Sequence, residues 1–79
     1  MTLRLFAQAR DAAGVPVDRY DVDTVAELLT AARARYGDAF DAVLGTARVW
    51  VNGDEPLDGE ATTLADGDEV AVLPPVSGG

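Results

Sequence analysis

The sequence predicts an α+β fold in which one main helix covers a mixed sheet of four to five strands. Three observations indicate this class. Apolar and polar residues alternate near both ends of the chain, as they do in half-buried strands. A central stretch carries apolar residues at helical spacing, between a start signal and a stop signal. The chain has 79 residues, so it has room for one small core and no deep cavity.

Two strands are expected before the helix. Residues 2–8 alternate in polarity, which places Phe6 outward, on the more polar face of the first strand. A glycine and a proline then mark a turn, and apolar residues return at strand spacing in residues 17–22. The two segments are therefore expected to form a hairpin.

The main helix is expected to begin after Thr24, because Glu27 stands three residues later and completes a capping box. Gly37 is its predicted left-handed cap. The apolar face of the helix consists of Val25, Leu28, Leu29, Ala32 and Tyr36. Residues 38–44 fit either a short helical turn or an irregular connection, and the sequence leaves both open.

Turn and strand signals fill the rest of the chain. Residues 48–51 are rich in β-branched and aromatic side chains and end at an Asn-Gly pair, which favours a tight hairpin turn. A short returning strand is expected near Leu57. Asp66 and Gly67 predict another turn, and a last strand is expected to run to Leu73.

The predicted order of elements is strand, strand, helix, strand, short strand, strand. This order matches the β-grasp arrangement of ubiquitin-like proteins, in which the first and last strands lie side by side in parallel at the sheet centre. A ferredoxin-like fold would require a second full helix, which the pattern does not indicate. We therefore expect a β-grasp domain over residues 1–74 and an extended flexible tail over residues 75–79.

The composition excludes most side-chain chemistry. Cysteine, histidine and lysine are absent, so the chain has no thiolate nucleophile, no ordinary zinc site and no Schiff-base amine. Fourteen acids against six arginines give a net charge of −8, which argues against a nucleic acid or an anionic membrane as partner. The sequence shows no signal peptide or membrane span, so a cytoplasmic protein is expected.

The acidic residues concentrate in the second half of the chain. Residues 49–79 contain seven acids and no base. These acids, all within residues 54–69, lie mostly in predicted turns, where Asp forms local backbone hydrogen bonds. The same acids are equally suited to guide docking onto a basic protein, and the sequence leaves both interpretations open.

The last six residues differ in character from the rest. Pro74 and Pro75 favour an extended backbone that leads away from the sheet, and Gly78 and Gly79 would let the terminal carboxylate enter a narrow channel. A carboxylate with a pKa of ~3.5 is ionised and is a poor electrophile, so another enzyme must activate it, usually by adenylation with ATP. Two terminal glycines also occur by chance in about one chain in 200. The projecting prolines and the lack of any other reactive group favour the functional interpretation.

Four segments together resemble a known family. They are Phe-Ala-Gln-Ala-Arg at residues 6–10, Val-Asn at 51–52, Leu-Ala-Asp-Gly-Asp-Glu-Val-Ala-Val at 64–72, and Leu-Pro-Pro-Val-Ser-Gly-Gly at 73–79. They resemble the small, sulfur-carrier subunits of molybdopterin synthase in the MoaD/ThiS family. The similarity covers nearly the whole chain and is most specific in the final segment.

The resemblance implies that Gly79 is adenylated by an ATP-dependent activating enzyme, converted to a thiocarboxylate with a sulfur donor, and inserted into the large synthase subunit. There it would give sulfur to cyclic pyranopterin monophosphate. It also implies that the carrier binds no cofactor or metal itself, is not an enzyme alone, and forms a heterotetramer with a dimeric large subunit. The residues expected in the partner's channel are Pro74, Pro75, Val76, Ser77 and Gly78. Phe6 and Leu73 match positions expected at the partner interface.

Other functions remain compatible with the same fold. A related carrier could serve thiamine, tRNA thiolation or amino-acid biosynthesis, since the helix and residues 24–47 match the family only in pattern. A protein modifier joined to target lysines would use the same terminus. A non-covalent β-grasp interaction domain would not use it.

Overall fold

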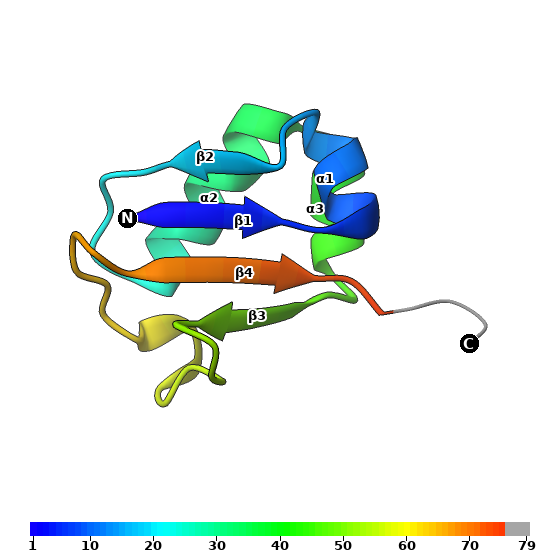
Figure 1. Ribbon diagram of the computed structural model, residues 1–79. Coiled ribbons are helices and arrows are strands. Elements are labelled where there is room, and N and C mark those ends of the chain that lie inside the picture. The colour runs from blue at the N-terminus through cyan, green and yellow to red at the C-terminus, as the bar shows by residue number, and fades with distance from the viewer. Residues whose placement is uncertain (76–79) are drawn as a thin grey trace.

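The computed structural model describes residues 1–75, which form a four-stranded mixed sheet with helices on one face (Figure 1). The strands are β1 (Thr2–Leu5), β2 (Val17–Arg19), β3 (Arg48–Val51) and β4 (Glu69–Leu73). The helices are α1 (Ala7–Ala13), α2 (Val25–Tyr36), α3 (Asp38–Leu44) and a 3₁₀ turn, η1 (Gly59–Ala61). The sheet order is β2-β1-β4-β3; β1 and β4 pair in parallel and the outer pairs are antiparallel. The predicted β-grasp topology is confirmed.

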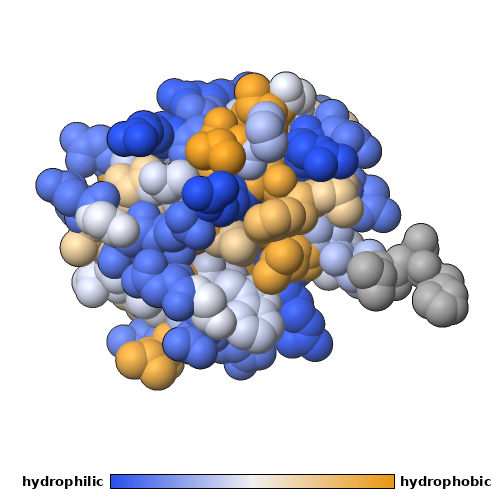
Figure 2. Space-filling model, in the orientation of Figure 1, coloured by the Kyte–Doolittle hydropathy of each residue, from blue (hydrophilic) through white to orange (hydrophobic). Residues whose placement is uncertain are grey.

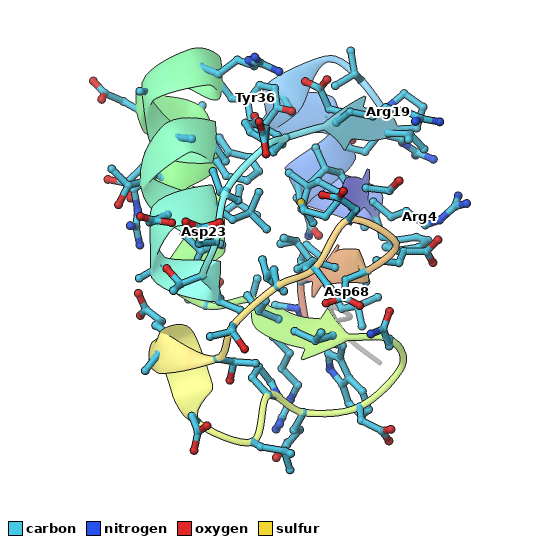
Figure 3. All side chains as sticks on the ribbon, turned by 90° about the vertical axis from the view of Figure 1, so that its left-hand side faces the viewer. Arg4, Arg19, Asp23, Tyr36 and Asp68 are labelled. Carbon is cyan, nitrogen blue, oxygen red and sulfur yellow. The ribbon has the colours of Figure 1, made fainter. Side chains whose placement is uncertain are left out.

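The core lies between the sheet and the helices, which Figure 3 shows as two layers seen from the side. Leu3 and Leu5 of β1 and Val70 and Val72 of β4 are buried, since alternate residues of both central strands point toward the helices. They meet a cluster of helical side chains that includes Val25, Leu28, Leu29, Ala32, Phe40 and Leu44. The two central strands, β1 and β4, are the first and last elements of the described residues, so both ends of the domain contribute to one core.

The start of α2 confirms the predicted N-cap. The Thr24 hydroxyl accepts a hydrogen bond from the Glu27 backbone N–H at 3.1 Å. The Glu27 carboxylate accepts from the N–H of Asp23 at 2.8 Å, one residue earlier than in a standard capping box. At the other end Gly37 has a φ of 94° but a ψ of −167°, so it is not the left-handed cap expected. Its extended ψ leads the chain directly into α3, which resolves residues 38–44 as a helix.

A helix replaces the end of the predicted first strand. Strand β1 stops at Leu5, and the chain turns at Ala7, whose φ of 49° lies in a region that costs an alanine about 1 kcal/mol. The following residues favour helix, and Gly14 ends α1 with a left-handed φ of 82°. Ala9 is fully buried, so packing of α1 onto the core compensates for the turn. The prediction of a strand over residues 2–8 is therefore wrong beyond Leu5, and within residues 1–75 the predicted main helix α2 is accompanied by the shorter helices α1 and α3.

Two further strand predictions need correction. Strand β2 spans only Val17–Arg19 of the predicted residues 17–22. The Asn-Gly turn after β3 is confirmed, with positive φ angles of 52° at Asn52 and 86° at Gly53. No strand forms at Leu57, which is 96% exposed. The segment between β3 and η1 pairs with β3 only through an isolated bridge between Val51 and Asp54. A single exposed apolar residue in a loop provides no buried face for a strand.

Asp18 connects the edge strand β2 to the C-terminal end of α2. Its Oδ2 accepts hydrogen bonds from the Tyr36 hydroxyl at 2.6 Å and from the Arg35 guanidinium at 2.8 Å. The Arg35 guanidinium also lies 4.6 Å from the centre of the Tyr20 ring. Donation by Tyr36, and then by Arg35, lowers the pKa of Asp18 below its ordinary value. The ionised carboxylate is therefore a structural element of the fold.

Replacing Asp18 by Asn should lower the free energy of unfolding at pH 7 by about 1 kcal/mol, because the bonds to the charged acceptor weaken in a partly solvated site. Because the pKa of Asp18 is lowered in the folded state, its contribution is present above the ordinary value of 3.8 and is lost as the pH falls below it. Urea unfolding of both proteins at pH 7 and pH 3 measures this. An equal difference at the two pH values would contradict the assignment.

Candidate functional site

The C-terminal segment leaves the domain from the centre of the sheet. Strand β4 ends at Leu73 between two neighbouring strands, and Pro74 and Pro75 continue the chain past the edge of the domain (Figure 1). Pro74 is half-buried and Pro75 is exposed. The other predicted tail residues, Val76, Ser77, Gly78 and Gly79, lie outside the described residues. We call Pro74 and Pro75 the root of the tail. The root directly follows β4, a central strand that is hydrogen-bonded to a neighbour on each side.

Phe6 and Leu73 lie at the same end of the sheet. Leu5 pairs with Val72 in the parallel ladder, so the next residue of each strand, Phe6 and Leu73, reaches the edge from which the tail departs. Phe6 is 43% exposed and occupies the N-cap position of α1, with an extended backbone and no capping hydrogen bond from its side chain. The prediction that Phe6 lies within the first strand is wrong, because β1 stops at Leu5. Its side chain is nevertheless exposed, at the end of the sheet from which the tail departs. Leu73 is half-buried.

The outer face of the sheet surrounds this edge with apolar groups. Residues that alternate with the buried ones point away from the helices, and Figure 2 shows apolar side chains gathered among charged ones on this face. By register the outward residues near the centre and the tail are Arg4, Val17, Arg48, Trp50, Ala71 and Leu73. We call these six residues together with Phe6 the outer face. Apolar patches rimmed by charge are typical of protein interfaces.

Trp50 is a member of the outer face that the sequence prediction did not single out. It pairs with Ala71 in the centre of the β3–β4 ladder and is only partly exposed. Its indole N–H is shielded from solvent and finds no hydrogen-bond partner within residues 1–75. The alternation of residues 48–51 contained the signal, because Val49 is inward and its neighbour must point outward.

Most arginines of the described residues form ion pairs, and several acids lie at the end of the sheet opposite the tail. Within residues 1–75, five of the six arginines form ion pairs, including Arg4 with Glu69 at 2.9 Å and Arg48 with Glu55 at 3.5 Å, both beside the outer face. Several other acids lie at the end of the sheet where β4 begins, opposite the tail. They are Asp21, Asp23, Asp54, Asp66 and Asp68. Asp66 and Asp68 are close to the tail in sequence but lie at the opposite end of β4 from its root.

Hydrogen bonds at this opposite end support the local interpretation of the acids. Asp68 accepts from the backbone N–H of Ala65 at 2.8 Å and from the Asn52 side-chain amide at 3.1 Å. These two bonds, the first being the larger cause, lower the pKa of Asp68. The Asn52 oxygen in turn accepts from the N–H of Glu69 at 2.9 Å. Asp68 thus connects the turn before β4 to the Asn-Gly turn after β3. This agrees with the interpretation that the acids form local hydrogen bonds in turns.

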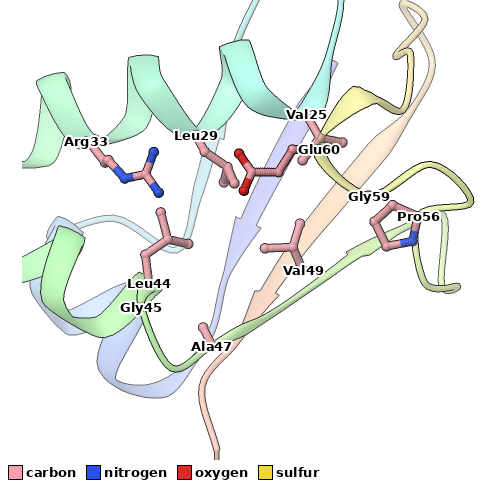
Figure 4. Close-up of a pocket in the computed structure, with 10 residues that line it drawn as sticks. All are labelled: Val25, Leu29, Arg33, Leu44, Gly45, Ala47, Val49, Pro56, Gly59 and Glu60. Carbon is pink, nitrogen blue, oxygen red and sulfur yellow. The ribbon is translucent and has the colours of Figure 1, made fainter.

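A recess lies between α2, α3, β3 and η1, away from the predicted site residues (Figure 4). It measures about 350 Å³, and its apolar lining includes Leu29, Leu44 and Val49. Arg33 and Glu60 stand at its rim, and Arg33 is paired with Asp41 at 2.8 Å. Of the predicted site residues that the structure describes, namely Phe6, Leu73, Pro74 and Pro75, none lines this recess.

Two further features are absent from the part of the chain that the structure describes. Within residues 1–75, no group of three acids is placed to hold a metal ion, and none of the helices there is long and apolar enough to cross a membrane.

Replacing Phe6 by Asp should weaken binding of a partner that covers the outer face by about tenfold or more, since an apolar contact worth roughly 1.5–3 kcal/mol is lost. Stability should be retained, because Asp is a favourable N-cap and Phe6 forms no cap bond. Titration calorimetry with the activating enzyme measures the affinity. Leu57→Asp, which removes an exposed apolar side chain elsewhere, is the matched control. Equal affinities for the two variants would exclude Phe6 from the interface.

The topology and the tail define the class: a ubiquitin-like β-grasp protein whose candidate site is a docking face around its C-terminal segment. The comparison with known families gives the particular assignment. The chain belongs to the ThiS family, whose profile matches residues 3–79. The resemblance to the MoaD/ThiS family is therefore confirmed.

Individual relatives fall into two named kinds. The small archaeal modifier protein 1 of Haloferax volcanii is 37% identical, with all of this chain and all of that protein covered. The molybdopterin synthase sulfur carrier subunit of Chlamydomonas reinhardtii is 36% identical, over 94% of this chain and 92% of the relative. The solution structure of the small archaeal modifier protein 1 from Methanosarcina acetivorans superimposes with a TM-score of 0.87 at 32% identity, covering 99% of this chain and 94% of that one.

Proposed function

We propose that this protein is the sulfur-carrier subunit of a molybdopterin synthase and that its reactive group is the Gly79 carboxylate. The observation that carries the proposal is the exit of the chain from the centre of the sheet: strand β4 ends at Leu73, Pro74 and Pro75 lead away from it, and the sequence continues with Val-Ser-Gly-Gly. The similarity to the Chlamydomonas sulfur carrier subunit supports this choice of pathway. Val76, Ser77 and Gly78 would line the partner's channel together with Pro74 and Pro75.

The chemistry requires two steps at the Gly79 carboxyl group, the first at its oxygen and the second at its carbon. A carboxylate oxygen of Gly79 attacks the α-phosphate of ATP and pyrophosphate leaves, which gives an acyl adenylate. Sulfide-level sulfur (HS⁻) from a donor then attacks the acyl carbon, and AMP leaves with the bridging oxygen, which gives the thiocarboxylate and a proton with no change of oxidation state. Glycine suits both steps, because no side chain obstructs approach to the carbon. The carrier contributes no acid, base or bound cofactor, so the ATP-binding enzyme must supply them.

Two protein partners follow from this chemistry. The first is the ATP-dependent activating enzyme, and the second is the large synthase subunit, in which the thiocarboxylate would give sulfur to cyclic pyranopterin monophosphate. If the large subunit is a dimer, two carriers would complete a heterotetramer. The outer face around Phe6 and Leu73 is the surface that both partners would cover.

A second function has specific support. The two small archaeal modifier proteins named above match the whole chain or nearly all of it, so a role as a protein modifier uses the same terminus. In that case the activated Gly79 would be transferred to a lysine amine of a target. This chain contains no lysine, so it could not extend into chains on itself.

Incubation with ATP, the activating enzyme and a sulfur donor tests the proposal. Intact mass spectrometry should show replacement of one oxygen by sulfur, and the product should then restore molybdopterin synthesis with the large subunit. Absence of the sulfur-containing mass would refute the carrier function. A thiocarboxylate that forms but does not support molybdopterin synthesis would assign the chain to another sulfur pathway. Covalent ladders in denaturing gels of cell extract would indicate the modifier.

A further inference from the structure

A second recess lies at the root of the tail, on the helical side of the sheet. It measures about 280 Å³ and lies between α1, α3 and the prolines that follow β4. Its described lining consists of Gln8, Ala42, Val43, Thr46, Pro74 and Pro75. Figure 1 shows α1 and α3 at the end of the molecule from which the chain leaves, and the two helices pack against each other. We call this recess the root groove.

The described lining of the root groove is uncharged, although a quarter of all residues in the chain are charged. Ala42, Val43 and the prolines present apolar surface, and the Thr46 hydroxyl donates to the Val43 carbonyl at 3.3 Å. A charged side chain buried there would find no opposite charge among these residues, which is costly. The groove therefore fits an aliphatic side chain.

The position of the groove determines which protein reaches it. Gly79 follows Pro75 by four positions, so the terminal carbon lies within about 14 Å of the groove wall even in a fully extended chain. An enzyme domain of ordinary size has a radius of gyration of about 13 Å or more, so it cannot enclose that carbon without contacting the root of the tail. The surface it meets has two sides: the outer face and the root groove.

We propose that the root groove is a docking site for an aliphatic side chain of the enzyme that adenylates Gly79. This inference rests on the proposed function of the terminus and adds a contact on the helical side of the sheet. The activating enzyme is the occupant because the ionised carboxylate must be activated before any other use. Contact with both the groove and the outer face clamps the root of the tail from two sides and orients it toward ATP.

Ala42→Arg tests the groove and Ala39→Arg is its matched control. Both positions are exposed on α3 and receive the same charge and bulk, but only Ala42 lines the groove. ATP–pyrophosphate exchange with the activating enzyme should show a KM for the Ala42 variant raised about tenfold or more, with kcat within about twofold, because an apolar contact is blocked while the chemistry is intact. The Ala39 variant should behave as the wild type.

Each other outcome overturns the proposal in a recognisable way. Equal KM values for the two variants would show that the enzyme does not contact the groove, while the proposed function stands. A wild-type chain that is not adenylated at all would remove both. Val76→Ser in the full chain tests whether the groove holds this chain's own tail: a fall in the unfolding midpoint by the 4–8 °C typical of about 1 kcal/mol would assign it so, whereas an unchanged midpoint is expected.

Discussion

Deletion of Gly78 and Gly79 is expected to lower the rate of adenylation by at least about 10²-fold. Removing two residues withdraws the terminal carboxylate by up to about 7 Å, and a misplacement of only about 1 Å can cost that factor in an enzyme active site. ATP–pyrophosphate exchange with the activating enzyme measures the rate. The loss should appear in kcat more than in KM, because the outer face and the root groove are intact in the deletion variant.

Ser77→Ala is the control for this deletion, since it changes the tail without changing its length. It should retain activity within a few-fold. A further variant with one residue appended after Gly79 should be as inactive as the deletion, because the new terminus is no longer the glycine that must react. Full activity of the deleted or the extended chain would show that the terminus is not the reactive group, and would leave a non-covalent interaction domain as the function.

Phe40→Ala is expected to lower the free energy of unfolding by about 3–5 kcal/mol, the range for removing a buried aromatic side chain. Phe40 is fully buried and packs edge to face against Tyr36, with ring centres 5.0 Å apart. A domain of this size has a total stability of roughly 4–12 kcal/mol, so most of the variant should unfold at moderate urea concentration. Urea unfolding followed by circular dichroism measures the loss.

Phe40→Leu is the matched variant, because it keeps an apolar side chain at the same position and should cost less than half as much. The comparison matters for function, since α3 carries both Phe40 and the wall of the root groove. A loss below about 1 kcal/mol for the alanine variant would show that α3 is not anchored through this ring.

The distribution of charge gives the two ends of the sheet different roles. The acids after residue 53 that are closest to the tail in sequence lie across β4 from its root, and a five-residue strand spans about 16 Å. This exceeds the Debye length of about 8 Å at physiological ionic strength. Asp66 and Asp68 therefore lie beyond this screening distance from the described root of the tail. The interpretation that the acids of residues 54–69 guide docking onto a basic protein stays a prediction.

Several local features were predictable because the responsible residues are neighbours in sequence. Thr24 and Glu27 start α2 through a bond within one turn, and the Asn-Gly pair at 52–53 forms a tight turn with its own backbone angles. The alternation of β4 likewise needed only the period of the strand. Helix α1 was missed although its composition favours helix, because the alternation of residues 2–8 also fits a strand. The choice depended on where Ala9 could be buried.

The sequence alone predicted the topology of the sheet and the main helix, and it led to the hypothesis that Gly79 is the reactive end, because each depends on local periodicity, local caps or the covalent order of the chain. The tertiary structure decided what surrounds the root of the tail, Pro74 and Pro75. Phe6, Leu73 and Trp50 share an outer face, and Gln8 and Ala42 share a groove, only because β1, β3, β4, α1 and α3 meet there. Contacts between residues so distant in the chain arise from packing of the whole core, which no local pattern encodes.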